Sequence, residues 1–323
     1  DTFTNKSIDL GTNTLTGSLA EFNSALQSES FVSLTGSETL TNKTLTSPTV
    51  TGATITTSTY NGMSLLLENN SIWLGSSPTA TTDTASYNVA VGTTALDSIT
   101  TGDNNVAIGY DAATALTTGA QNVVIGYGAG KTSATNNGNV YIGYLANNLA
   151  DDNTSDNVVI GSSANQFSTE NSHVVAIGSN AMLGSSGNTG GAGNNVAVGS
   201  AAMYAVTTGG QNTAIGRSSL VALTEGVSNS ALGTHGLAGV TTGDWNIGIG
   251  HYAGDNITTG DNNIIIGKSI NAPSATDDDQ LNIGDTIYAD MSADKVGIGI
   301  SSPKTTLTVE GAITLKEQSA ADS

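Results

Sequence analysis

Residues 105–109 read Asn-Val-Ala-Ile-Gly, and variants of this pentapeptide recur along most of the chain. Of the thirteen intervals between successive motif glycines, ten are 17 residues long and the others are 18, 21 and 15. Such a regular period predicts a solenoid in which each repeat forms one coil of about 17 residues. The motif glycines are Gly75, Gly92, Gly109, Gly126, Gly143, Gly161, Gly178, Gly199, Gly216, Gly233, Gly250, Gly267, Gly284 and Gly299.

Aliphatic residues flank the central residue of the motif. The residue directly before the glycine is Leu, Val or Ile in all fourteen copies. The residue three positions before the glycine is aliphatic in twelve copies, with Thr213 and Ser230 as the exceptions. Side chains two apart lie on the same face of a strand. The motif therefore predicts a short strand whose aliphatic residues form the inner face, with a small residue such as Ala107 between them.

Asparagine is the first residue of most motif copies. Its recurrence at one position of successive coils predicts a ladder of stacked side-chain amides. A ligand-binding face would not need so many copies of one residue, so a binding role is the weaker interpretation. The repeated glycine predicts a backbone turn that a Cβ atom would obstruct. The motif asparagines are Asn88, Asn105, Asn122, Asn139, Asn157, Asn195, Asn212, Asn229, Asn246 and Asn263.

A second segment follows each motif and ends in a turn. Alanine stands three residues after the glycine in eight copies, and five coils contain the tripeptide Thr-Thr-Gly, first at residues 100–102. Glycine next to Asp or Asn is typical of turns. We therefore expect two short strands and two turns per coil, in a flattened parallel β-solenoid, or β-roll. Thirteen intervals at about 4.8 Å each would span on the order of 60 Å.

These residues resemble a known family of repeats. The motif Asn-[Val/Ser]-Ala-[Ile/Leu]-Gly, followed three residues later by Ala, is similar to the repeat in heads of trimeric autotransporter adhesins and in β-roll segments of phage tail fibres. The adhesin repeats are a few residues shorter than 17. The resemblance implies an all-β, left-handed β-roll of about 13 coils over residues 71–300, assembled as a fibrous homotrimer.

The two ends of the chain carry different patterns. Residues 1–70 are expected to form a slender stalk with a five-residue step, and Ser18 and Glu21 form a capping box that predicts a short helix at about 18–28. Residues 34–55 are similar to stalk segments of bacteriophage tail fibres. Residues 301–323 resemble the linker that precedes a C-terminal tip or a self-cleaving folding chaperone, so we expect them to lead to a missing or cleaved tip.

Composition excludes several classes of function. The 323 residues include 8 Lys and Arg against 27 Asp and Glu, a formal net charge of −19, which disfavours binding to nucleic acid or to anionic membranes. Cysteine is absent from the sequence, so there is no disulfide framework and no thiolate site. No run of 18 apolar residues is present, and the first ten residues lack the pattern of a signal peptide. We therefore expect a soluble chain, or one carried by a larger assembly, without membrane insertion.

The histidines do not predict a catalytic centre. His173, His235 and His251 occupy different columns of the repeat, and no Ser-His-Asp arrangement follows from their spacing. His235 and His251 lie on adjacent coils, where a metal pair is an option, but no third ligand shares their columns. Exposed turn residues are the better interpretation. We therefore expect no enzymatic activity and no cofactor.

Two further pairs are candidate binding residues. Trp245 and Tyr252 are placed on neighbouring coils and would form a small glycan-contacting patch. Asp244 and Asp261 follow Thr-Thr-Gly turns of consecutive coils, so their carboxylates are expected about one strand spacing apart, near 4.8 Å, where Ca²⁺ would relieve their repulsion. The alternative for the second pair is two aspartates that face water. The 21-residue interval also predicts a protruding loop within residues 184–193.

These patterns together favour a virion protein. We expect the shaft of a phage tail fibre, located on the virion and outside the cell, with other tail proteins and a host surface glycan or protein receptor as partners. The alternative is the head of a bacterial trimeric autotransporter-type adhesin. A glycan-degrading tailspike ranks below both, and an ice-binding solenoid lower still, because the threonines do not form a flat Thr-x-Thr array.

Overall fold

The residues that the structure describes form one β-sheet unit. The computed structural model describes residues 57–60, 63–75, 78–79, 84–149, 154–167, 172–184 and 192–314. The chain divides into units 1–54 and 55–323, and every described residue belongs to the second unit. These residues form one 18-stranded sheet with no helix among them. The all-β class is therefore confirmed for the described residues.

The strands follow one another along the chain with regular spacing. The first three are β1 (Thr57–Tyr60), β2 (Met63–Glu68) and β3 (Ser71–Gly75). The motif copies form β4 (Val89–Gly92), β5 (Val106–Ile108), β6 (Val123–Ile125), β7 (Val140–Ile142), β8 (Val158–Ile160), β9 (Val175–Ile177), β10 (Val196–Val198), β11 (Thr213–Ile215), β12 (Ser230–Leu232), β13 (Ile247–Ile249) and β14 (Ile264–Ile266). The last four are β15 (Gln280–Ile283), β16 (Ile287–Asp290), β17 (Lys295–Ile298) and β18 (Leu307–Val309).

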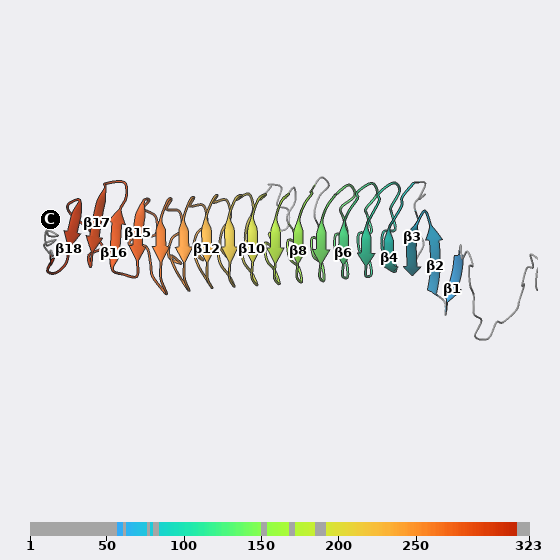
Figure 1. Ribbon diagram of the computed structural model, residues 1–323, viewed down its shortest axis with the longest axis horizontal. Coiled ribbons are helices and arrows are strands. Elements are labelled where there is room, and N and C mark those ends of the chain that lie inside the picture. The colour runs from blue at the N-terminus through green and yellow to red at the C-terminus, as the bar shows by residue number, and fades with distance from the viewer. Residues whose placement is uncertain are drawn as a thin grey trace, which may run out of the picture. The chain divides into compact units, whose positions relative to one another are not determined.

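Strands β3 to β15 form one parallel stack with one strand per coil (Figure 1). Equivalent residues pair throughout, so Ala107 of β5 lies between Ala90 of β4 and Val124 of β6. Main-chain bonds join successive coils, as where the amide of Val106 donates to the carbonyl of Asn122 at 2.8 Å. The parallel β-solenoid with about 17 residues per coil is therefore confirmed.

Antiparallel strands flank both ends of the parallel stack. At the first end β2 is antiparallel to β1 and to β3, and at the other β16 is antiparallel to β15 and to β17. The expectation that the coils continue to Gly299 is therefore wrong. The 15 residues after Gly284 are too few for a coil, so the chain forms two hairpins there, and β18 then pairs in parallel with β17. These strands cover edges that the parallel stack would otherwise expose.

The side of each coil opposite the strand is a run of turns, and the second strand expected in each coil is not found in the described coils. Within a run the third residue after the motif glycine bonds back to it, as Ala112 does to Gly109 at 3.4 Å between N and O. Two residues of the run have positive φ, for example Asp111 at 55° and Ala113 at 49°. Left-handed residues at this spacing prevent an extended strand. Main-chain bonds at alternate residues join the coils here: the amides of Leu96 and Ser98 donate to the carbonyls of Ala112 and Thr114, both at 3.1 Å.

The two faces of the strands are the reverse of the sequence prediction. The central residue of the motif is buried in every strand from β4 to β14. The residues on either side of it, aliphatic except for Thr213 and Ser230, are half-buried or exposed. In β5, Ala107 is 0% exposed and Ile108 is 38% exposed. The prediction of an aliphatic inner face is therefore wrong, because the interior of the coil is too narrow for two columns of branched side chains.

The core is filled by pairing large with small residues across this narrow interior. Where the turn run supplies Leu237, the facing strand has Gly248, and a Cβ atom on that glycine would lie 2.6 Å from Cγ of the leucine. Where the strand supplies Ile265, the turn run has Gly254. Most coils combine alanine in the strand with a buried Leu or Met in the turns. Small strand residues are therefore a packing requirement of the fold.

Several expectations fall outside the described residues. They concern residues 1–56 of the stalk expected over 1–70, its helix at about 18–28, residues 185–191 of the loop expected within 184–193, and residues 315–323 of the linker expected over 301–323. The described parts of the two terminal segments contain strands, β1 and β2 in the first and β18 in the last. Within the described part of the chain, no helix has the length and apolar character needed to cross a membrane.

Candidate functional site

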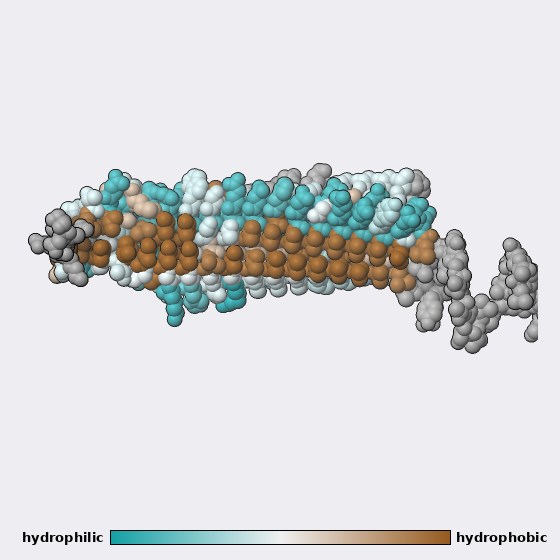
Figure 2. Space-filling model, viewed as in Figure 1, coloured by the Kyte–Doolittle hydropathy of each residue, from teal (hydrophilic) through white to brown (hydrophobic). Residues whose placement is uncertain are grey.

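An outward-facing apolar surface is the most extensive surface feature of the solenoid. It consists of the first and third residues of strands β4 to β14, which we call the aliphatic stripe. All of these residues are Val, Ile or Leu except Thr213 and Ser230. The most exposed are Ile108, Ile215, Leu232 and Ile249, at 38 to 51%. Figure 2 shows the stripe as a brown band along the strand side of the coils, interrupted by one paler stretch.

The size of the aliphatic stripe distinguishes it from ordinary surface hydrophobicity. Twenty partly exposed aliphatic side chains in two columns present on the order of 1,000 Å² of apolar surface, whereas the largest patch on a typical monomer is roughly 300–600 Å². A stable interface buries about 800 Å² per partner. The stripe is therefore large enough to hold another protein surface.

The asparagine ladder lies directly behind the start of the strands. All ten motif asparagines are buried. In Asn229, Nδ2 donates to Oδ1 of Asn212 at 3.1 Å and to the carbonyl of Gly243 at 2.8 Å. Its Oδ1 accepts from the main-chain amide of Asn246 at 2.9 Å and from Nδ2 of that residue at 3.1 Å. The amides are thus used within the solenoid and are not available to a ligand.

The motif glycines are required for two reasons. Gly109 has a φ of 135°, and a Cβ atom on it would lie 2.5 Å from the carbonyl oxygen of Gly126 on the next coil. In the Thr-Thr-Gly turns the glycine has no positive φ, and close approach alone explains it: a Cβ on Gly243 would lie 2.4 Å from the carbonyl oxygen of Gly260. Both glycines allow successive coils to stack without a side chain between them.

Two polar edges border the aliphatic stripe. The strand-start edge comprises the two residues before each motif asparagine, or before its equivalent Gln280, and the strand-end edge comprises the two residues after each motif glycine. At the strand-start edge, Oδ1 of Asp244 accepts the amide of Val227, and Oδ1 of Asp261 accepts the amide of Asp244, both at 2.7 Å. Asp278 accepts the amide of Asp261 in the same way. These aspartates therefore bond to the backbone of the preceding coil.

The strand-end edge carries a cluster of aromatic and cationic side chains. Nη2 of Arg217 lies 3.2 Å from Nε2 of His235, whose ring stacks on Tyr252 with a centroid distance of 4.6 Å. His251 contacts the same tyrosine edge-on at 4.4 Å. Desolvation, together with the charges of Arg217 and His251, lowers the pKa of His235 below its usual value. A neutral ring at His235 suits a contact in which the guanidinium donates to Nε2. Lys268 is exposed on the same edge.

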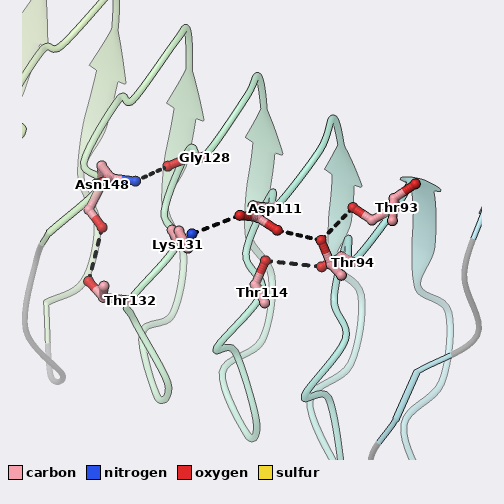
Figure 3. A network of polar contacts seen from close by, with 8 residues as sticks. All are labelled: Thr93, Thr94, Asp111, Thr114, Gly128, Lys131, Thr132 and Asn148. Carbon is pink, nitrogen blue, oxygen red and sulfur yellow. Dashed lines mark hydrogen bonds and ion pairs between the residues drawn. The ribbon is translucent and has the colours of Figure 1, made fainter.

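Earlier coils carry tyrosines at the strand-end edge. The rings of Tyr110 and Tyr127 stack at 5.3 Å, and those of Tyr127 and Tyr144 at 5.4 Å. Beside them the ammonium group of Lys131 pairs with the carboxylate of Asp111 at 2.7 Å, as Figure 3 shows.

The Asp111 carboxylate is balanced between burial and hydrogen bonding. Desolvation raises its pKa, but hydrogen bonds from Lys131 and Thr94 outweigh this effect, so its pKa lies below the ordinary value. The hydroxyl of Thr94 donates to the same carboxylate (Figure 3). This network therefore connects three consecutive coils on the turn side.

The structure does not bring the predicted glycan contacts together. Trp245 precedes β13 and Tyr252 follows it, so an extended strand separates them and they lie on opposite edges of the aliphatic stripe. The prediction of one patch from this pair is therefore wrong for a single chain. Trp245 itself is exposed, at 57%.

The predicted metal and histidine pairs have different outcomes. Asp244 and Asp261 are on adjacent coils as expected, but no cluster of three or more His, Asp or Glu side chains able to hold a metal ion occurs among the described residues. Calcium binding stays a prediction. His235 and His251 do come together, through Tyr252, whereas His173 lies apart beside Asp156 at 3.8 Å.

Sequence reasoning missed the outward stripe and the tyrosine ladder. The small central residue of most motif copies was a signal for the first, because Gly or Ala is needed wherever the turn run fills the narrow coil with a large side chain. Tyrosine directly after the glycine in three successive motifs was a signal for the second. Searches against known protein families, curated proteins and solved structures found no match for this chain. The fold defines the described part of the chain as a parallel β-solenoid built from repeats.

Proposed function

We propose that this chain is the shaft of a fibre that assembles through the aliphatic stripe into a homotrimer of left-handed β-rolls. The single observation that carries the proposal is the pair of outward aliphatic columns. Water contact along both columns is unfavourable by about 25 cal/mol per Å² of apolar surface. Self-association removes this surface from water along the whole stack. Parallel coils add length without open edges, so the shaft is mechanical in function and not enzymatic.

We assign the fibre to a bacteriophage tail, where it contributes to attachment to the host cell surface. The similarity of residues 34–55 to tail-fibre stalks supports this assignment. Its partners are further copies of the chain, other tail proteins and a host glycan or protein receptor. The second candidate is the head of a bacterial trimeric adhesin, which the Asn-Val-Ala-Ile-Gly repeat also supports. Locating the protein in an imaged virion distinguishes the two.

Light scattering tests the assembly. We expect a mass of three times 32.3 kDa at micromolar concentration. Ile108→Asp combined with Ile249→Asp places charges on the aliphatic stripe without burying them in the single chain, and should shift the mass to that of a monomer. Thr242→Asp, at an exposed turn away from the stripe, is the control and should remain trimeric. A soluble wild-type monomer of 32 kDa would overturn the proposal.

A further inference from the structure

We infer that copies of this chain meet edge to edge, with the strand-start edge of one copy against the strand-end edge of the next, at equal height along the fibre. The inference rests on the self-assembly proposed above and adds its direction and register. The residues that meet are Trp245, Asp261 and Asp278 on one edge and His251 and Lys268 on the other.

Symmetry determines which edges meet. Every strand from β3 to β15 runs in the same direction and crosses the axis along which the coils stack. Consider copies that are related by rotation about an axis parallel to the stacking axis and that face this rotation axis with their aliphatic stripes. All strands then point in the same direction around the rotation axis. The end of each strand then comes beside the start of the equivalent strand in the next copy. The contact is heterologous and closes into a ring.

The charges on the two edges match at the same height. Asp244 and Asp261 precede β13 and β14, while His251 and Lys268 follow the same two strands. Lys268 is one of only eight Lys and Arg residues in a chain of net charge −19, and no carboxylate of a described residue lies within 4.0 Å of it. Its counter-charge is therefore supplied by the neighbouring copy.

The match depends on register. Three coils earlier, at β11, the strand-start edge consists of Gly210 and Gln211, which carry no charge. A copy displaced by three coils, about 14 Å, would place Lys268 opposite this uncharged edge. A copy in equal register places it opposite Asp261, next to Asp278 of the following coil. The Oδ1 atoms of both aspartates accept main-chain amides, and their Oδ2 atoms take no part in that ladder. Equal register is therefore electrostatically favoured over this three-coil displacement.

Trp245 supplies an apolar anchor at the same height. It is 57% exposed, and it has the positive φ that recurs at this position of the coils, 55° here. On the opposite edge of β13 lies the pair formed by His251 and Tyr252. Edge-to-edge packing covers the indole with this pair, and buried tryptophan is typical of interface hot spots.

Cysteine cross-linking tests the contact, because the chain has no cysteine of its own. Asn262 and Ser269 are exposed at the two ends of β14, so Asn262→Cys and Ser269→Cys in one chain cannot meet each other within that chain. We expect mild oxidation of this double variant to give covalent dimers and trimers under denaturing conditions. Each single variant should remain a monomer there. The offset pair Gln211→Cys with Ser269→Cys should cross-link at least tenfold less.

The outcomes separate this inference from the proposed function. A trimer by light scattering that cross-links through the offset pair, or through neither pair, would overturn the inference and leave the proposed function intact. A monomer would overturn both. Lys268→Glu should weaken assembly about tenfold, and an unchanged assembly constant would contradict the charge pairing.

Tryptophan fluorescence provides a second readout that needs no cross-link. The experiment uses the variant Trp73→Phe, in which Trp245 is the only tryptophan; Trp73 itself is 1% exposed. We expect the emission of Trp245 to be blue-shifted and protected from acrylamide in the assembled protein, and to become exposed in the stripe variant with aspartates at positions 108 and 249. Equal quenching in both proteins would overturn the burial of Trp245.

Discussion

The asparagine ladder makes a quantitative prediction for Asn229→Leu, which keeps the side-chain size and removes the amide. Asn229 takes part in four side-chain hydrogen bonds, with Asn212, Gly243 and twice with Asn246. Net contributions of about 1 kcal/mol per bond, and about 1–3 kcal/mol for the orphaned amide of Asn246, give an expected loss of about 5–7 kcal/mol. The missing bonds lie within one coil and its two neighbours.

Native-state hydrogen exchange measures this loss where it occurs. Because each coil contacts only its neighbours, protection should fall in the coils of β12 and β13 and remain unchanged at β5. Asn229→Asp adds a test by pH. Its carboxyl would face two oxygen acceptors in a buried site, so its pKa in the folded state is raised and stability is lost as the pH rises. A free energy of opening for Asn229→Leu within about 0.5 kcal/mol of wild type would refute the ladder as a source of stability.

Three further predictions concern other columns of the repeat. Gly109→Ala should lower the free energy of unfolding by about 3–5 kcal/mol, because it combines strain at a φ of 135° with a clash against the next coil. Gly284→Ala, where the added Cβ would have no atom within 4 Å, is the control and should cost about 1 kcal/mol. Equal melting temperatures of the two variants would contradict the packing argument. Lys131→Ala should move the midpoint of acid unfolding to higher pH. In the native protein the pKa of Asp111 is lowered, so this carboxylate stabilises the fold above its ordinary pKa near 3.8 and loses that effect as the pH falls through the lowered pKa. The variant removes the main cause of the lowering and therefore this stabilisation. Asp261→Asn keeps an amide acceptor and should melt like wild type, while Asp261→Ala should melt lower. A melting temperature that rises with millimolar Ca²⁺ only when Asp261 is intact would instead establish the calcium site.

Much of the architecture is determined by local sequence. The 17-residue spacing of glycines specifies the coil, because a glycine without Cβ is needed wherever one coil contacts the next, as at Gly109 and Gly126. The column of asparagines specifies parallel stacking in equal register, because asparagines on successive coils bond to one another, with one interruption at Val174. The predicted end of the parallel stack was wrong. Gly284 and Gly299 continue the sequence motif, but the chain between them forms antiparallel hairpins.

The orientation of the strand faces was decided only by the tertiary structure. An alternation such as Val106, Ala107, Ile108 separates two faces but does not say which is buried, because both are apolar. The choice depends on the distance between the strand and the turn run, and leucines such as Leu237 enter from the turn side and leave room only for Gly or Ala. The branched residues must then face outward. The outward aliphatic stripe is thus a consequence of the narrow interior of the coil. The sequence of a single motif does not specify this width.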